Sequence, residues 1–392
     1  MTLEVRPLGT TCDLKCGYCY QNVHRRARPG DEASYDLDKL KQAIEAHGDG
    51  FHLFGGEPLL MPEDDLEELW RWGYEKYGRN GLQTNGVRLN PRHVEMIRRY
   101  NVMVGVSIDG PAELNDARWA GTLETTRQAT ARSEAAIRML CDARLPPHLM
   151  IQLTRQNCAA DRLLRLHAWL RELDALGVSS ARLHVLEIET KGVRRQLAMS
   201  IDDNVAVLSG LIDLEQELPR LRFDLSREIA ALLTGRDDTA ACVWRACDPY
   251  TTAAVHGTDG HGVPHNCGLT DKEGIDFLKP DRPGYERYLA LYHTPQEHGG
   301  CQGCRFFLVC KGQCPGTAID KDWRNRSEYC EVWKRIFARF ETDLVAQGQV
   351  PITLSPRRAQ WEQELVAGWM QGHNLQLHYD MGVSTGAEID QG

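Results

Sequence analysis

The grouping of cysteines is the feature that most constrains this chain. Of its 13 cysteines, three fall within residues 12–19 and eight within residues 242–330. Only Cys141 and Cys158 stand alone, and we expect both to be buried thiols. The N-terminus lacks the apolar stretch of a signal peptide, so we expect a cytoplasmic protein, in which reducing conditions disfavour disulfides. The grouped cysteines therefore indicate metal ligation.

Charge and hydropathy exclude several kinds of partner. The formal net charge is −9, and no polybasic run is present. Nucleic-acid binding and attachment to an anionic membrane surface both need such a basic footprint. Nowhere do eighteen apolar residues follow one another, as a membrane-spanning helix would require. We therefore expect no nucleic acid and no membrane among the partners.

The first half of the chain has the pattern of an α/β fold. From residue 3 to about 215, short apolar runs alternate with longer amphipathic ones, which is typical of strand–helix units around a parallel sheet. Six strands are expected, at residues 3–8, 51–54, 82–84, 102–108, 148–153 and 182–187. Six units predict a partial (β/α)6 barrel and not a closed eight-stranded one. Residues 202–233 are expected to be helical and to close this half.

The second half has a different texture. After residue 235 the periodicity disappears, Gly, His, Asp and Cys become frequent, and residues 256–264 are rich in turn formers. Such a segment forms little apolar core and needs cross-links to be stable, which metal clusters can supply. A helix is expected after Cys330 and another amphipathic stretch at 360–370. We thus expect a core domain at 1–235, a loop-rich cluster domain at 236–340 and a helical tail at 341–392.

The first chemical motif is a CxxxCxxC directly after the first expected strand. Its ligands would be Cys12, Cys16 and Cys19. Three thiolates can hold three irons of a four-iron cube and leave the fourth iron open for chemistry. A zinc site is the alternative, but structural zinc takes four ligands, usually from two CxxC pairs, and this spacing fits that pattern poorly.

Three polar loops each follow an expected strand and should meet at one edge of the sheet. They are GGEP at 55–58, TNG at 84–86 and SIDG at 107–110. Glycine lets the backbone approach a ligand closely, Glu57 can accept from an ammonium group, and Ser107 with Asp109 can bond ribose hydroxyls. Each loop alone could be an ordinary turn, whereas the three in this order specifically indicate a ligand-binding site.

Together these motifs resemble the radical S-adenosylmethionine superfamily over about residues 1–225. The resemblance implies that the first three cysteines bind a [4Fe–4S] cluster whose open iron takes the amino and carboxylate groups of S-adenosylmethionine. Tyr18 would lie near the adenine, and Arg118 would pair with the carboxylate unless it is a solvated surface charge. The implied cofactor-binding residues are Tyr18, Gly55, Gly56, Glu57, Thr84, Asn85, Ser107, Asp109 and Arg118.

The later cysteines, over about residues 240–335, closely resemble a SPASM domain, which carries two auxiliary [4Fe–4S] clusters. By that resemblance one cluster takes Cys247, Cys267 and Cys314, with Cys242 as the fourth ligand or, alternatively, as a buried thiol beside an open iron. The other cluster takes Cys301, Cys304, Cys310 and Cys330. The chain would thus hold three [4Fe–4S] clusters. Two zinc sites are the alternative for this block.

Other polar residues near these motifs are less specific. His256, His261 and His265 are expected to support the cluster domain and not to ligate, because the cysteines suffice. Glu187 ends the sixth expected strand and Glu189 lies just beyond it. Both are candidates for a catalytic base, the alternative being a solvated carboxylate.

The resemblance implies a function as well as a fold. Such enzymes cleave S-adenosylmethionine to methionine and a 5′-deoxyadenosyl radical, and the auxiliary clusters imply an oxidation. We therefore predict a peptide maturase that forms a carbon–carbon or thioether crosslink in a ribosomally synthesised peptide. The first alternative is an anaerobic sulfatase-maturing enzyme, which makes formylglycine. That branch usually has Asp directly after the cysteine matching Cys267, where this chain has Gly268.

An iron–sulfur electron-transfer protein is the alternative of another class. Glu57, Ser107 and Asp109 argue against it, because an electron carrier needs no nucleoside-binding loops. The expected partners are a precursor peptide or protein and a reducing partner such as flavodoxin or ferredoxin. Only eleven residues precede Cys12, so leader recognition would fall to a separate leader-binding protein or to the tail, unless none is needed.

Overall fold

The computed structural model describes residues 3–27, 34–245, 247, 255–271, 284–373, 375 and 377. Contacts divide the chain into two compact units. The first unit comprises Met1–Ser200, Gly210–Asp224 and Val255–Gly268, and the second comprises Ile201–Ser209, Leu225–Ala254 and Leu269–Gly392. The expected boundaries at residues 235 and 340 stay predictions.

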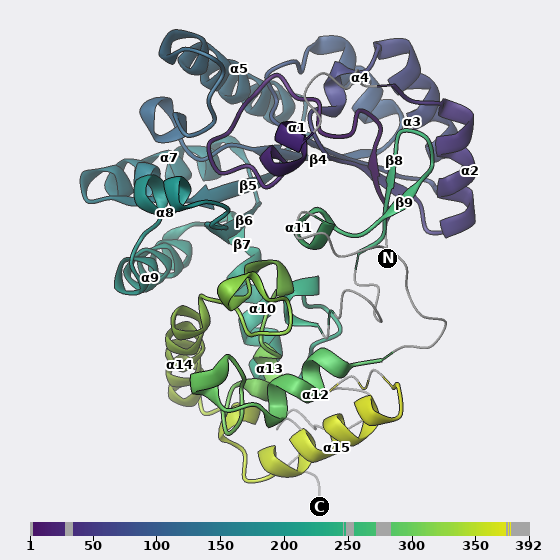
Figure 1. Cartoon of the computed structure of the whole chain (residues 1–392). Helices are drawn as coiled ribbons and strands as arrows, with labels where there is room; N and C mark the ends of the chain where they lie inside the picture. Colours follow the sequence, from purple (N-terminus) through teal and green to yellow (C-terminus); the bar gives the residue numbers. More distant parts are fainter. Residues whose placement is uncertain are drawn as a thin grey trace, which may run out of the picture. The chain divides into compact units, whose positions relative to one another are not determined.

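A mixed sheet organises the first unit, in the order β7-β6-β5-β4-β3-β2-β1-β8-β9 (Figure 1). Its strands are β1 (Leu3–Arg6), β2 (Phe51–Leu53), β3 (Asn80–Thr84), β4 (Val102–Ser107), β5 (His148–Leu153), β6 (Ser180–Val185), β7 (Arg222–Phe223), β8 (Gly257–Asp259) and β9 (Pro264–His265). All neighbours pair parallel except β8 and β9. The six expected strands are present, and the predicted α/β fold with a parallel sheet is confirmed.

Helices alternate with these strands and continue into the second unit. The α-helices are α1 (Asn22–Ala27), α2 (Leu37–His47), α3 (Glu63–Tyr77), α4 (Pro91–Arg99), α5 (Leu123–Asp142), α6 (Arg155–Cys158), α7 (Asp161–Leu176), α8 (Lys191–Leu197), α9 (Ile201–Glu217), α10 (Asp224–Leu233), α11 (Gly268–Asp271), α12 (Glu286–His293), α13 (Phe307–Cys310), α14 (Cys330–Ala346) and α15 (Arg358–Met370). Short 3-10 turns are η1 (Pro58–Leu60), η2 (Ala112–Asn115), η3 (Cys242–Trp244), η4 (Gln296–His298), η5 (Pro315–Thr317), η6 (Ile319–Lys321) and η7 (Ile352–Leu354).

Helix α2 shows how local sequence sets these elements. Asp36 caps its N-terminus by accepting from the backbone N–H groups of Asp38 and Lys39, and Gly48 ends it at φ 89°. Its apolar face buries Leu40 and Ile44 completely. In Figure 1, α2, α3 and α4 follow one another along the sheet.

Residues 202–233 are mostly helical, as expected, but the helical segment is interrupted. Helices α9 and α10 are separated by a turn and by β7, which pairs with β6. Pro219 lacks a backbone N–H and cannot continue the helix. The Asp174 carboxylate accepts from the backbone N–H groups of Arg220 at 2.8 Å and Leu221 at 2.7 Å, which secures the break.

Residues 256–264 are also more ordered than a turn-rich segment. They contribute the β8–β9 hairpin, whose first strand pairs with the outer edge of β1. Without it, β1 would leave a row of unpaired backbone groups. A Cβ on Gly257 would lie 2.1 Å from the imidazole of His265, so glycine permits this close pairing. The sequence contains little indication of this hairpin, because both strands are too short to show the alternation of apolar and polar residues that is typical of a strand.

The second unit has an aromatic core as well as its cysteines. Trp244 is 1% exposed and meets Trp333 and Phe337 edge-on. Trp369 stacks on Tyr285 with ring centroids 6.0 Å apart. The helix expected after Cys330 is α14, and the stretch at 360–370 lies in α15. In the described part of the chain, no helix is both long and apolar enough to cross a bilayer.

Candidate functional site

The CxxxCxxC loop leaves β1 and is pinned to the segment after β4. The backbone N–H of Lys15 donates to the Trp119 carbonyl at 2.6 Å, and that of Gly17 to the Ala117 carbonyl at 2.8 Å. Burial raises the pKa of the Cys12 thiol to about 11 and that of Cys16 to about 12. Isolated thiolates are thus disfavoured here, and a bound cation would offset that cost.

Glu57 lies at the centre of the loops that follow β2 and β3. Its side chain is buried, at 1% exposed. One carboxylate oxygen accepts from the Thr84 hydroxyl at 2.7 Å and the Leu59 backbone N–H at 3.0 Å, and the other from the Asn85 backbone N–H at 2.7 Å. Burial raises the pKa of Glu57 to about 7, although these hydrogen bonds oppose the shift. A carboxylate has about four acceptor positions, so one remains for a ligand.

Gly56 is where the GGEP loop touches the cysteine loop. Its φ is 53°, and a Cβ there would lie 2.0 Å from the Thr11 carbonyl oxygen. The next residue, Glu57, donates its backbone N–H to the same carbonyl at 2.9 Å. The side-chain oxygen of Gln21 accepts from the backbone N–H of Gly56 at 3.0 Å. Only glycine fits this contact between the two motifs.

Replacing Gly56 with Ala should therefore destabilise the fold more than the same change at Gly48. Gly48 has a positive φ of 89° but no atom within 4 Å of an added Cβ. The backbone strain, about 1–2 kcal/mol, is common to both variants, whereas G56A adds an overpacking cost of about 1–3 kcal/mol. Chemical denaturation of the two variants measures the difference. Equal losses of unfolding free energy would contradict the close approach.

A buried charge network lies after β4. Asp109 is 1% exposed, and its carboxylate accepts from Tyr18, from Arg118 Nε at 3.2 Å and from the Gln152 backbone N–H at 3.1 Å. The Arg118 side chain is 10% exposed and lies 4.0 Å from Cys16 Sγ. Arg118 is therefore not a solvated surface charge, and the structure links Tyr18, Asp109 and Arg118 beside the cysteine loop.

The remaining predicted cofactor residues lie at the same sheet edge. The Ser107 hydroxyl accepts from Gln83 at 2.7 Å. The Asn85 side-chain amide donates to Asp13 at 2.8 Å, next to Cys12. Glu189 is 7% exposed and Glu187 is partly buried, so neither is simply a solvated carboxylate. Their role as base stays a prediction.

Tyr20 is the residue that sequence reasoning missed. A Cβ on Gly268 would lie 2.2 Å from Tyr20 Cε2 and 2.8 Å from its hydroxyl oxygen. The Tyr20 ring thus occupies the space that a side chain after Cys267 would need. Burial is the main cause that raises the pKa of this phenol, and Glu4 and Glu187 also raise it. The only sequence signal was an aromatic residue next to Cys19, which does not reveal a contact 248 positions away.

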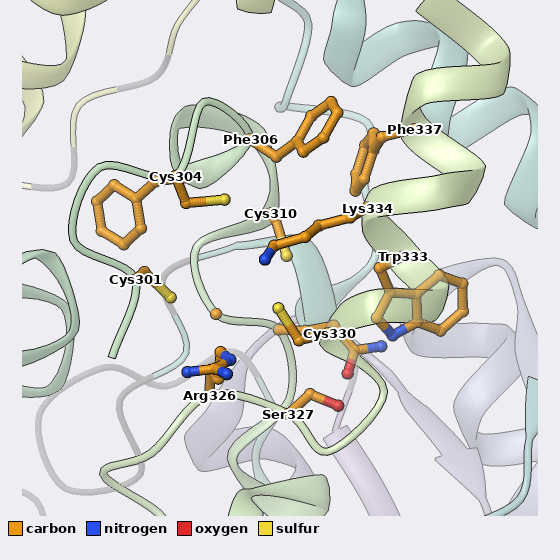
Figure 2. Close-up of a pocket in the computed structure, with 13 residues that line it drawn as sticks. Cys301, Cys304, Phe306, Cys310, Arg326, Ser327, Cys330, Trp333, Lys334 and Phe337 are labelled. Carbon is orange, nitrogen blue, oxygen red and sulfur yellow. The ribbon is translucent and has the colours of Figure 1, made fainter. Parts of the chain in front are cut away.

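A second site lies within the second unit. Cys301, Cys304, Cys310 and Cys330 line one pocket (Figure 2). Its remaining lining includes the aromatic rings of Phe306, Phe307, Trp333 and Phe337 and the polar side chains of Gln313, Arg326, Ser327 and Lys334. Burial raises the pKa of the Cys301 thiol to about 12, and the neighbouring thiols add to that shift. The structure thus brings these four cysteines together, and their role as ligands of one cluster stays a prediction.

The four cysteines expected to bind the other auxiliary cluster are divided between the units. Cys267 belongs to the first, and Cys242, Cys247 and Cys314 belong to the second, so this ligand set stays a prediction. Among the described residues, no three His, Cys, Asp or Glu side chains are grouped to hold a single metal ion. In an iron–sulfur cube, by contrast, each thiolate binds a different iron.

The fold and the cysteine loop define the class of protein. Residues 7–157 match the family described as Radical SAM superfamily. The chain carries a radical SAM domain and is a radical SAM enzyme, as predicted. That family implies a [4Fe–4S] cluster and S-adenosylmethionine as cofactors.

Sulfatase-maturating enzymes are among its relatives. The cysteine-type anaerobic sulfatase-maturating enzyme of Clostridium perfringens is 28% identical over 366 residues, which is 86% of this chain and 95% of the relative. The serine-type anaerobic sulfatase-maturating enzyme of Bacteroides thetaiotaomicron is 34% identical over 128 residues, 29% of this chain and 30% of the relative.

Solved structures share the fold. The enzyme anSMEcpe with bound AdoMet matches with a TM-score of 0.67 at 18% identity, over 88% of this chain and 98% of that one. A structure of native anSMEcpe with AdoMet and the Kp18Cys peptide matches with the same TM-score at 17% identity and the same coverage. SuiB of Streptococcus suis matches with a TM-score of 0.56 at 15% identity, over 84% of this chain and 76% of that one.

Proposed function

We propose that this chain is a maturase that oxidises one side chain of a peptide or protein substrate, converting Cys or Ser to formylglycine. The observation that carries the proposal is the similarity to a cysteine-type sulfatase-maturating enzyme over nearly the whole of that relative. This was the alternative in the sequence analysis, and the comparisons favour it over the crosslinking function predicted first.

The residues of the first unit fit the cofactor that this function needs. Cys12, Cys16 and Cys19 would hold the catalytic cluster, which together with S-adenosylmethionine supplies a 5′-deoxyadenosyl radical for hydrogen abstraction. Glu57 has one acceptor position left for the ammonium group. Arg118 lies beside Cys16 and would face the carboxylate.

The four-cysteine pocket supports an oxidative reaction. After hydrogen abstraction, the substrate radical must lose one electron and one proton to give the oxidised product, and a cluster on Cys301, Cys304, Cys310 and Cys330 would accept the electron. With the four further cysteines predicted for the other auxiliary site, the chain would hold three clusters. The reducing partner and a leader-binding protein belong to this proposal as expected partners.

Crosslink formation remains a second candidate because of Gly268. The sulfatase-maturing branch usually has Asp at this place, and here the Tyr20 ring fills the space. A base from position 268 is therefore missing, and Glu187 or Glu189 would have to take the proton.

Mass spectrometry separates the two functions. The reconstituted protein would be incubated with S-adenosylmethionine, a reductant and either sulfatase peptides with Cys or Ser at the modified position or peptides encoded beside the gene. Conversion of Cys to formylglycine replaces sulfur with oxygen and removes two hydrogens, whereas conversion of Ser removes two hydrogens only. In both cases the aldehyde reacts with a hydrazide. A crosslink also loses two hydrogens but resists the hydrazide and suppresses fragmentation between the joined residues. Deuterium uptake without any other mass change would refute both oxidative functions.

A further inference from the structure

We propose that Arg326 and Lys334 are positioning residues that set the reduction potential of the cluster expected in the four-cysteine pocket. The inference rests on the proposed function, because it assumes that this pocket holds an iron–sulfur cluster. Both side chains line the pocket together with the four thiols. Figure 2 shows the ammonium of Lys334 among the sulfur atoms, and Arg326 below them in this view.

The pocket creates an electrostatic problem that two cations would relieve. A cube held by four thiolates carries net negative charge and gains one more on reduction. Phe306, Trp333 and Phe337 supply apolar walls, and charge is costly in such surroundings. A fixed positive charge nearby favours the reduced form and so raises the potential.

Arg326 has a donor left over for the cluster. Its Nη1 donates to the backbone carbonyl oxygens of Gln296 and Gly300, the latter at 2.8 Å. Its Nε is buried and has no hydrogen-bond partner among the described residues. A buried donor without a partner is destabilising. A sulfur atom of a bound cluster would satisfy this donor.

The guanidinium of Arg287, whose charge also acts on Cys301, is already occupied by other acceptors. Its guanidinium donates to the carbonyl oxygens of Trp323, Gln313 and Asn325 at 2.6–3.1 Å. Arg287 therefore braces the loops around the pocket, and Arg326 is the arginine with a donor to spare.

Lys334 is held beside the pocket by its place on α14. It follows Cys330 by four residues, so the two side chains share one face of the helix. Its ammonium donates to Gln296 at 2.8 Å and to Glu331 at 2.9 Å. Its side chain is 25% exposed, so its charge is only partly screened by water.

The test is an EPR-monitored redox titration of the full-length, anaerobically reconstituted protein. The signal that disappears in Cys310→Ala identifies the cluster of this pocket. Lys334→Met and Arg326→Met should each lower its midpoint potential while iron content is unchanged. We expect at least a tenfold change in the ratio of reduced to oxidised cluster at fixed potential, about 59 mV for one electron. Lys334→Arg, which keeps the charge, should restore the potential.

Two matched controls each remove a positive charge from a residue that is close in sequence to Lys334 or Arg326 but does not line the pocket. Arg335, next to Lys334, pairs with Asp202 at 2.5 Å, and Arg324, two residues before Arg326, pairs with Asp322 at 2.6 Å. Arg335→Met and Arg324→Met should leave the potential unchanged. An unchanged potential in both test variants, or equal shifts in the controls, would overturn the inference.

The outcomes separate this inference from the proposed function. If wild type shows no signal that depends on Cys310, the cluster site and the inference both fail. If the potential shifts as expected but no peptide is modified, the inference stands and the formylglycine proposal fails. Lys334 is partly exposed, so its methionine variant provides the measurement even if loss of Arg326 impairs folding.

Discussion

Replacing Cys12, Cys16 and Cys19 together with Ala should remove about four irons per chain and abolish cleavage of S-adenosylmethionine. The three thiols come from one loop that is pinned at Lys15 and Gly17, so the backbone will keep its path without the metal. The second unit, with its own four-cysteine pocket, should keep its iron. Iron analysis and detection of 5′-deoxyadenosine by chromatography measure both effects.

Cys141→Ala is the matched control, because Cys141 lies in α5, outside both cysteine groups. This variant should keep all iron and full cleavage activity. Two results would contradict the assignment: unchanged iron in the triple variant, or zinc in place of iron after anaerobic purification. The second would favour the zinc alternative for the whole chain.

The sheet was predictable because its strands are buried apolar runs bounded by polar loops. β2 and β5 were found within one residue, since Leu53, Leu149 and Ile151 face the core. The hairpin of β8 and β9 was not predictable, because what holds it is the unpaired edge of β1, more than 250 positions earlier. Likewise, the break between α9 and α10 is secured by Asp174, from another helix.

The site was predictable as a set of residues but not as a network. Because each motif follows an expected strand, the sequence predicts that Glu57, Asp109 and Arg118 lie at one edge of the sheet. That Asp109 would be bonded by Tyr18, Arg118 and Gln152 follows from tertiary packing, which no spacing reveals. The burial of Arg118 also follows from tertiary packing and could not be predicted, since an arginine in a loop is usually solvated.

Glu57 carries the second large prediction. Glu57→Gln should leave iron content intact and weaken S-adenosylmethionine binding about tenfold to hundredfold, because a charge-assisted hydrogen bond to the ammonium becomes a neutral one. The affinity of wild type should also depend on pH. With the pKa of Glu57 at about 7, protonation below that pH removes the negative charge, so affinity falls as the medium becomes acidic. Glu57→Gln should lack this pH dependence.

Thr84→Val distinguishes a ligand contact from a structural brace. It removes the hydroxyl that donates to Glu57 at 2.7 Å but keeps the carboxylate and the backbone donors of Leu59 and Asn85. If Glu57 meets the ligand, Thr84→Val should weaken binding much less than Glu57→Gln and should retain the pH dependence. Isothermal titration across pH 6–8 provides both quantities. Equal losses in the two variants would show that Glu57 only joins the GGEP loop to the loop after β3, because either change would then act by loosening the same turn.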